Sequence, residues 1–150
     1  MVEATLDKEI NRLKDQHIRI TPQRKTILNY LITHHNHPTV ETLFSDLSAE
    51  QSNLSMATIY NTLNLLVSVG IVIELSNETA GIRYDYFGRP HFHAICDNCG
   101  KITDVFYDNF PKIQSELKQV ANEQTGYQIS TAHVEVHGLC TDCQKLQRRN

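Results

Sequence analysis

Two C-x-x-C pairs are the residues of this 150-residue chain best suited to bind a metal. Cys96 and Cys99 are followed directly by Gly100, and Cys140 and Cys143 form a second pair late in the sequence. Glycine tolerates the tight turn that such a knuckle needs, and four thiolates suit zinc in a closed tetrahedral site. A closed site leaves no position for water, so we expect this zinc to be structural.

Two other interpretations of the four cysteines remain open. They could be buried free thiols, or one C-x-x-C pair could be redox-active. A redox-active pair is expected to open a helix within a βαβ unit, and the sequence pattern contains no such unit. In a reducing compartment, two C-x-x-C pairs also favour zinc over disulfides.

A second kind of ligand stands just before the first knuckle. His91 and His93 are two residues apart, so on a strand both imidazoles leave the same face while Phe92 points the other way. Imidazole combined with carboxylate suits iron, manganese or exchangeable zinc. We therefore expect a sensor site here. The alternative is an ordinary strand with two solvated histidines.

The charge is distributed unevenly along the chain. The net charge of −3 is mildly unfavourable for binding nucleic acid, but residues 12–25 carry a local positive excess. Such a patch can steer the protein onto DNA in a salt-sensitive way. No stretch is long and apolar enough to span a bilayer, and Met1 to Leu13 lacks an apolar signal core, so we expect a cytoplasmic protein without a membrane partner. The basic residues of the patch are Arg12, Lys14, Arg19, Arg24 and Lys25, against Asp15 alone.

The first part of the chain predicts helices followed by a β-hairpin. Helical spacing of apolar residues, capping residues and a later two-residue alternation support these elements. This order is typical of a winged helix-turn-helix, in which the helix after the turn enters the major groove. The expected elements are a helix over 3–16, one from Thr21-Pro22, one capped by Thr39, one over 56–69 capped by Ser55, and strands 71–75 and 82–87 joined by a turn at 76–81.

The second part predicts a small α/β module, giving an α+β protein with two domains. Gly88-Arg89-Pro90 is the expected hinge, between a DNA-binding domain over 1–87 and a dimerisation domain over 91–150. Small modules with thin cores often need a metal or a partner chain. The expected elements are strands 91–96 and 101–107, a helix from Pro111 with Ile113, Leu117, Val120 and Ala121 facing inward, a strand over 127–139, and a basic tail.

Together these motifs resemble the ferric uptake regulator family of bacterial metal-dependent repressors, along essentially the whole chain. The matching pieces are Arg19-Ile20-Thr21-Pro22-Gln23-Arg24, His37-Pro38-Thr39, Ala57-Thr58-Ile59-Tyr60-Asn61, His91-x-His93-x-x-Cys96-x-x-Cys99-Gly100 and Gly138-x-Cys140-x-x-Cys143. The resemblance implies a homodimer that binds double-stranded operator DNA when Fe²⁺ or Mn²⁺ is bound. It does not imply an enzyme.

The chain looks most like the peroxide-sensing branch of this family. The resemblance implies a regulatory metal bound by ligands that match His37, Asp85, His91, His93 and Asp104. Asp104 is the discriminating ligand, because iron-sensing relatives more often have Glu there; Asn61 also resembles the peroxide branch. In that branch, bound Fe²⁺ activates hydrogen peroxide and a ligand imidazole, here His37 or His91, is oxidised, which ends repression. Mn²⁺ supports repression without this reactivity.

The expected DNA contacts lie on the predicted recognition helix and the basic patch, and the alternative for the helix is an ordinary polar face. Asn61 and Asn64 can hydrogen-bond adenine edges, while Thr58 or Tyr60 can reach phosphate or a thymine methyl group. Arg19, Arg24 and Lys25 are expected on the DNA backbone, and Ser55 at the start of the helix completes the set. The recognition helix departs from close relatives, which usually have Asn-Asn-Leu-Arg after the tyrosine, because Asn64 replaces that arginine.

Three points remain open from the sequence. A repressor responding to iron, manganese or zinc availability would use the same ligands without oxidising them. A metal-storing or thiol-redox protein would lack the basic patch and the helix-turn-helix. His133 and His137 match no accessory site with certainty.

Overall fold

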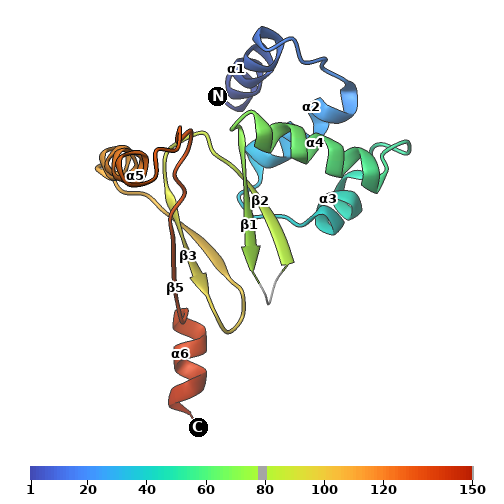
Figure 1. The fold of residues 1–150 in the computed structure, drawn as a ribbon. Helices are drawn as coiled ribbons and strands as arrows, with labels where there is room; N and C mark the ends of the chain where they lie inside the picture. The colour runs from blue at the N-terminus through green and yellow to red at the C-terminus, as the bar shows by residue number, and fades with distance from the viewer. Residues whose placement is uncertain (78–80, 150) are drawn as a thin grey trace. The chain divides into compact units, whose positions relative to one another are not determined.

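The chain divides into two compact units, Met1–Gly88 and Arg89–Asn150. The computed structural model describes residues 1–77 and 81–149, and each unit has its own sheet, two-stranded in the first and three-stranded in the second. Figure 1 shows both units along the chain.

The first unit begins with four helices whose starts follow from capping residues. The hydroxyls of Thr21, Thr39 and Ser55 each accept a hydrogen bond from the backbone N–H three residues later. This satisfies a donor that a helix start otherwise leaves unpaired, so all three predicted caps are confirmed. The helices are α1 (Val2–Asp15), α2 (Pro22–Thr33), α3 (Val40–Leu47) and α4 (Met56–Ser68).

A hairpin completes the first unit, as predicted. Strands β1 (Val72–Asn77) and β2 (Gly81–Tyr86) pair antiparallel, with Ile73 opposite Asp85. The turn predicted over 76–81 falls in part on residues 78–80, which lie outside the described residues. The helices and the hairpin share one apolar core, whose least exposed members include Leu13, Ile27, Leu28, Leu31, Leu43, Ile59, Leu63, Leu66 and Ile71.

The second unit is built on a central strand. Strand β3 (Phe92–Cys96) pairs antiparallel with β4 (Ile102–Val105) and parallel with β5 (Glu135–Gly138). Helix α5 (Phe110–Thr125) connects β4 to β5, and α6 (Thr141–Arg148) follows β5. The predicted α+β fold class, with a winged helix-turn-helix followed by a small α/β unit, is confirmed.

One expectation about the end of the chain was wrong, and one helix there was not predicted. The strand predicted over 127–139 is only Glu135–Gly138, which pairs with His93 to Cys96 of β3. The chain before β5 is held differently, since the Gln114 side-chain amide donates to the Ala132 carbonyl at 2.8 Å. The basic tail, for which no structure was predicted, forms α6.

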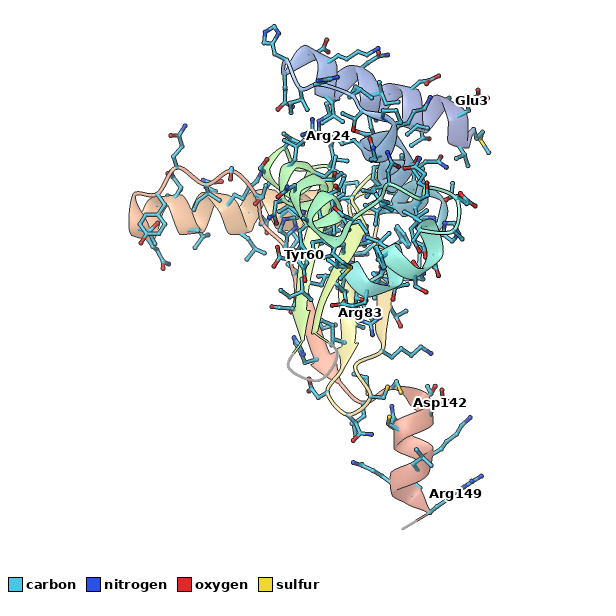
Figure 2. All side chains as sticks on the ribbon, turned by 90° about the vertical axis from the view of Figure 1, so that its right-hand side faces the viewer. Glu3, Arg24, Tyr60, Arg83, Asp142 and Arg149 are labelled. Atoms are coloured by element: carbon cyan, nitrogen blue, oxygen red, sulfur yellow. The ribbon has the colours of Figure 1, made fainter. Side chains whose placement is uncertain are left out.

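The inward face predicted for α5 was also partly wrong. Leu117 and Val120 are 46% and 48% exposed, and the buried anchor of this helix is Phe110, whose ring lies 5.4 Å from that of Phe92. A helix of 16 residues is about 24 Å long. This helix runs across the strands (Figure 2), and a sheet of three strands is only about 10 Å wide between its outer strands. The small sheet therefore cannot cover the whole apolar face of α5.

No helix among the described residues has the length and apolar character needed to cross a bilayer.

A buried polar contact joins α1 to the end of β2. Glu9 is 3% exposed, and the Tyr86 hydroxyl donates to its Oε1 at 2.9 Å. Burial, followed by this hydrogen bond, raises the pKa of Tyr86 above its usual value, so the hydroxyl keeps the proton that it donates. The Tyr86 ring also lies against Gly88, where a Cβ atom would stand 2.3 Å from the ring. Gly88 therefore cannot carry a side chain in this conformation.

We predict that Tyr86→Phe lowers the free energy of unfolding of the first unit by about 1–3 kcal/mol, because it leaves a buried carboxylate oxygen without its donor. Native-state hydrogen exchange of amides in α1 and α4 measures this loss. Tyr107→Phe removes the hydroxyl of a 50% exposed tyrosine and should stay within about 0.5 kcal/mol. Equal losses in both variants would contradict the role given to the Glu9 contact.

Candidate metal centres

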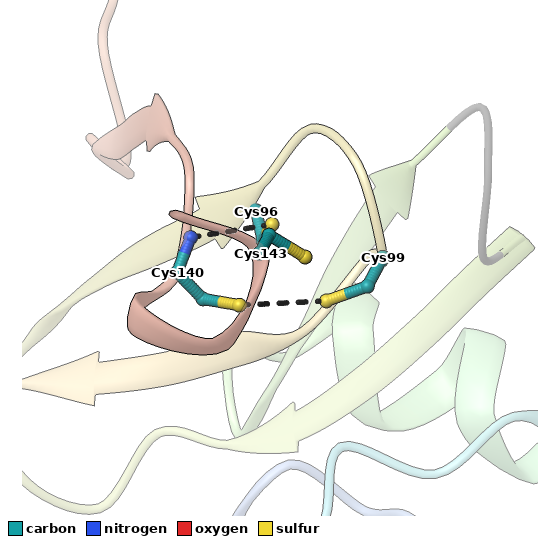
Figure 3. Close-up of side chains that lie close together, drawn as sticks. All are labelled: Cys96, Cys99, Cys140 and Cys143. Atoms are coloured by element: carbon teal, nitrogen blue, oxygen red, sulfur yellow. Dashed lines mark hydrogen bonds between the residues drawn. The ribbon is translucent and has the colours of Figure 1, made fainter. Parts of the chain in front are cut away.

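The four cysteines come together in the second unit. Their Sγ atoms all lie within 4.8 Å of one another, and those of Cys99 and Cys140 are 3.8 Å apart (Figure 3). A disulfide needs about 2.05 Å between sulfur atoms, whereas a tetrahedron with Zn–S bonds of about 2.3 Å has an edge of about 3.8 Å. The spacing therefore fits four ligands of one zinc ion better than a disulfide.

Strand pairing brings the two C-x-x-C pairs together. Cys96 ends β3 opposite Gly138 of β5, and the Asp97 N–H donates to the Gly138 carbonyl at 2.8 Å. This contact starts the second knuckle beside the first, so the Cys140 N–H donates to Cys96 Sγ at 3.3 Å. Gly100, at φ +76°, closes the first knuckle and donates to the Cys96 carbonyl at 2.9 Å.

The thiols of this cluster differ in acidity. Backbone N–H groups, first that of Cys140 and then that of Cys99, lower the pKa of Cys96 to about 6. At Cys143 the Asn98 amide, 3.2 Å from Sγ, lowers the pKa, but burial and the neighbouring thiols together raise it above its usual value. Crowded thiols resist ionising together, and a divalent cation removes this conflict because it binds thiolates. The donor set fits zinc.

A second ligand group lies where β3 pairs with β4. The antiparallel register places His93 directly opposite Asp104, and their Nε2 and Oδ1 atoms are 3.2 Å apart. His91 Nε2 is 3.6 Å from the same Oδ1 atom and 3.2 Å from His93 Nε2. Two imidazole nitrogens and one carboxylate oxygen therefore converge on one point.

A hydrogen bond to the backbone orients the first of these histidines. His91 Nδ1 lies 2.7 Å from the Arg89 carbonyl oxygen, which can only accept, so Nδ1 carries the proton. The lone pair is then on Nε2, the nitrogen that faces His93 and Asp104. This arrangement is typical of metal-binding histidines, whose second nitrogen is held by a carbonyl or carboxylate.

The other two predicted regulatory ligands form a pair within the first unit. His37 Nε2 lies 3.9 Å from Asp85 Oδ2, and both side chains are buried. His37 has φ +47°, a left-handed conformation that costs a non-glycine residue about 1–2 kcal/mol. The adjoining backbone is tied to β2, since the Tyr84 N–H donates to the Pro38 carbonyl at 3.0 Å. The five predicted ligands thus form two groups, one in each unit.

Most of the predicted DNA-contacting residues of α4 are on its exposed side. Ser55, Tyr60, Asn61 and Asn64 are exposed, and Tyr60 is labelled in Figure 2. Thr58 is partly buried, and its hydroxyl lies 2.9 Å from that of Ser55. The opposite side of α4 packs into the core of the first unit.

The basic residues of the first unit are not all available to a ligand. Arg19 and Lys25 are exposed, but the Arg24 guanidinium (Figure 2) donates to the Arg19 carbonyl at 2.6 Å. Arg12 donates to the Val69 carbonyl at 3.0 Å, at the end of α4. Arg12 therefore stabilises a helix end, a role that its charge alone does not indicate.

The two histidines left unassigned by the sequence lie in the second unit. Desolvation, and then the charge of nearby His93, lower the pKa of His133. His137 Nδ1 lies 2.9 Å from Asp97 Oδ1, with Glu135 next to Nε2, and these two carboxylates raise the pKa of His137. The sequence missed the contacts of His133 and His137 because each depends on where β5 begins.

Comparison with known proteins relates the chain to one family. The model of the ferric uptake regulator family matches residues 15–137 of this chain. The peroxide-responsive repressor PerR of Staphylococcus saprophyticus is 40% identical over 143 residues, which are 95% of this chain and 94% of that protein.

Solved structures of peroxide-responsive regulators are also similar to this chain. The PerR of Streptococcus pyogenes, described in a structural study of peroxide sensing and gene regulation, is 37% identical with a TM-score of 0.54, covering 93% of this chain and 92% of that one. The Campylobacter jejuni peroxide stress regulator is 28% identical with a TM-score of 0.68, covering 89% and 98%. The family match covers most of the chain, and the Staphylococcus relative covers nearly all of it. The chain therefore belongs to the ferric uptake regulator family of metal-dependent repressors, and it resembles the peroxide-responsive members of that family.

Proposed function

We propose that this protein is a homodimeric, peroxide-responsive repressor that binds operator DNA when Fe²⁺ or Mn²⁺ occupies a regulatory site. The observation that carries the proposal is the division of the predicted ligands between the two units. His37 and Asp85 belong to the first unit, and His91, His93 and Asp104 belong to the second. A metal bound by both groups would favour one arrangement of the units, and thereby one affinity for DNA.

The donor chemistry supports iron or manganese at the regulatory site. Three imidazole nitrogens and two carboxylates suit Fe²⁺ or Mn²⁺, while the thiolates are gathered in the separate cysteine cluster. We assign structural zinc to Cys96, Cys99, Cys140 and Cys143. These ligands would clamp β3 and the start of α6 within the second unit.

The second unit also has the features expected of a dimerisation domain. The apolar side chains that α5 leaves uncovered are accompanied by an exposed Tyr127 and by Val136 on β5. β5 is an edge strand, exposed along its whole length. Edge strands and apolar patches are usually covered in a stable assembly. A second copy of this chain is the partner that we propose.

Fe²⁺ held by the proposed regulatory ligands would supply the electron that breaks the O–O bond of hydrogen peroxide; overall, one peroxide oxygen would be added to an imidazole ring and the other would leave as water. The residues decide where the oxygen goes: we propose that it is added to His37 or His91, the two ligands that the resemblance singles out. An oxidised imidazole is a poor ligand, so the units are released from the bound arrangement and DNA affinity falls. A repressor that senses metal availability alone is the alternative, and it would leave both rings intact.

We predict that peroxide releases the iron-loaded dimer from DNA but not the manganese-loaded dimer. A duplex selected from a random pool by the Mn²⁺-loaded protein serves as the operator, and anaerobic fluorescence anisotropy measures binding before and after dilute peroxide. Peptide mass spectrometry should then find one added oxygen on the His37 or His91 peptide of the iron form. Retained DNA binding with both histidines intact would favour the metal-availability repressor.

We predict that Cys143→Ser abolishes zinc retention and disrupts the second unit, because one ligand of a closed site is lost. Zinc per chain, measured colorimetrically after denaturation, should fall from about one to near zero. Thr141→Ala, an exposed neighbour on α6, is the matched control and should keep its zinc. Full zinc content in the cysteine variant would contradict the ligand assignment.

We predict that Asn61→Ala and Lys25→Gln weaken DNA binding in different ways. Asn61→Ala removes a base contact, so it should reduce the discrimination between operator and unrelated DNA by about 1–3 kcal/mol. Lys25→Gln removes a phosphate contact, so it should weaken binding to all DNA sequences alike. It should also lower the slope of log affinity against log salt concentration by about 1. Lys25 is the better residue to substitute than Arg24, because the Arg24 guanidinium also donates a hydrogen bond to the Arg19 carbonyl. Identical behaviour of the two variants across sequences would argue against this docking.

A further inference from the structure

The conformation of His37 needs external support. Its φ of +47° lies in a region that side chains other than glycine rarely adopt, and Pro38 follows directly. A backbone in this state persists only where surrounding contacts determine it. The contacts that hold this turn therefore decide where the imidazole points.

One contact comes from the side chain of Arg83. Its Nη1 donates to the His37 carbonyl at 3.2 Å, 46 residues away along the chain. Its Nε is buried and has no hydrogen-bond partner among the described residues. Burying part of a guanidinium with an unsatisfied donor is unfavourable, so stability alone does not explain Arg83 at this position.

The position of Arg83 on β2 relates it to the ligand pair. Arg83 and Asp85 are two residues apart on a strand, so their side chains leave the same face. Asp85 faces the His37 imidazole, with 3.9 Å between Oδ2 and Nε2, while Arg83 binds the His37 carbonyl. One face of β2 thus contacts both the side chain and the backbone of His37.

The turn is anchored on its other side as well. The Asn36 amide donates to the Tyr30 hydroxyl at 3.0 Å, and that hydroxyl donates to Asp46 Oδ2 at 2.5 Å. Asn36 is thus tied to α2 and, through Tyr30, to α3. Release of the Arg83 contact would remove one of the described hydrogen bonds that hold the turn, beside those of the Asn36 amide and the Pro38 carbonyl.

We infer that Arg83 is a positioning residue for the regulatory metal: it holds the left-handed backbone of His37 so that Nε2 faces Asp85. This inference rests on the proposed function, because it takes His37 and Asp85 as regulatory ligands. Arg83 itself does not contact the metal.

The variant Arg83→Met separates positioning from simple electrostatics. It keeps the length of the apolar stem but removes the donor and the positive charge. Loss of a nearby positive charge would by itself strengthen binding of a divalent cation. Loss of positioning should weaken it, and we expect a decrease of about tenfold in Mn²⁺ affinity, in the range seen for residues that orient metal ligands. Electron paramagnetic resonance of free Mn²⁺, on the zinc-loaded dimer, measures the affinity.

Two further variants serve as controls. Arg83→Lys keeps a donor and the charge, and it should recover part of the lost affinity. Arg12→Met removes another arginine of the first unit that donates to a carbonyl, that of Val69, and it should leave Mn²⁺ affinity unchanged. Equal weakening by the Arg12 variant would mean that any loss of an arginine–carbonyl contact acts through stability, which overturns the inference.

A measurement without the regulatory metal keeps the test independent of folding yield and of loading with Mn²⁺. The imidazole NMR signals of His37 in the folded, zinc-loaded protein should shift in Arg83→Met and remain in place in Arg12→Met. His37→Ala sets the reference for the proposed function. If it leaves Mn²⁺ affinity unchanged, the ligand set is wrong; if it weakens binding while Arg83→Met does not, the role of Arg83 alone is wrong.

Discussion

The hydrogen bonding of β3 on both of its edges is the constraint on which the second unit depends. On one edge, the antiparallel register with β4 sets His93 opposite Asp104 and so forms the histidine–carboxylate group. On the other edge, the parallel register with β5 sets Cys96 opposite Gly138 and so brings the second C-x-x-C pair to the first. One strand of five residues thus fixes two chemically different ligand groups. A slip of one residue on either edge would turn the ligands to the wrong face.

In the first unit, the position of the candidate ligand His37 depends on a strained turn and not on strand register. Asp85 is placed by the hairpin, but His37 depends on hydrogen bonds from β2 to the backbone on either side of Pro38. If the turn relaxed in the absence of metal, part of the binding free energy would be needed to restore its conformation. If the proposed ligand set binds the metal, rigid contacts around His37 would increase the metal affinity, because less ordering of the turn remains to be done when the ion binds.

The sequence predicted the elements that local rules determine. Capping by Thr21, Thr39 and Ser55, the hairpin and the cysteine pairs are all visible as short patterns, and the structure contains them. The two wrong predictions, the length of β5 and the inward orientation of Leu117 and Val120, depended on contacts distant in sequence. The helix of the tail was not predicted. The structural roles of Arg12 and Arg83 could not be predicted either, since the carbonyl groups that they bind lie 57 and 46 residues away along the chain. The candidate ligands could be named from the sequence, but the contacts that orient them could not.

The parallel pairing of β3 with β5 also bears on the order in which the protein folds. The first unit consists of helices and a hairpin with mostly local contacts, which form quickly. The second unit must close a long loop before His93 can pair with Glu135. The four cysteines proposed as zinc ligands span the same loop, so zinc bound to them would act as a cross-link. Such a link lowers the entropy of the unfolded chain and would stabilise the folded unit by about 4 kcal/mol. Under the proposed ligand assignment, zinc binding would therefore set the moment at which a folded first unit gains the second half of its regulatory ligands.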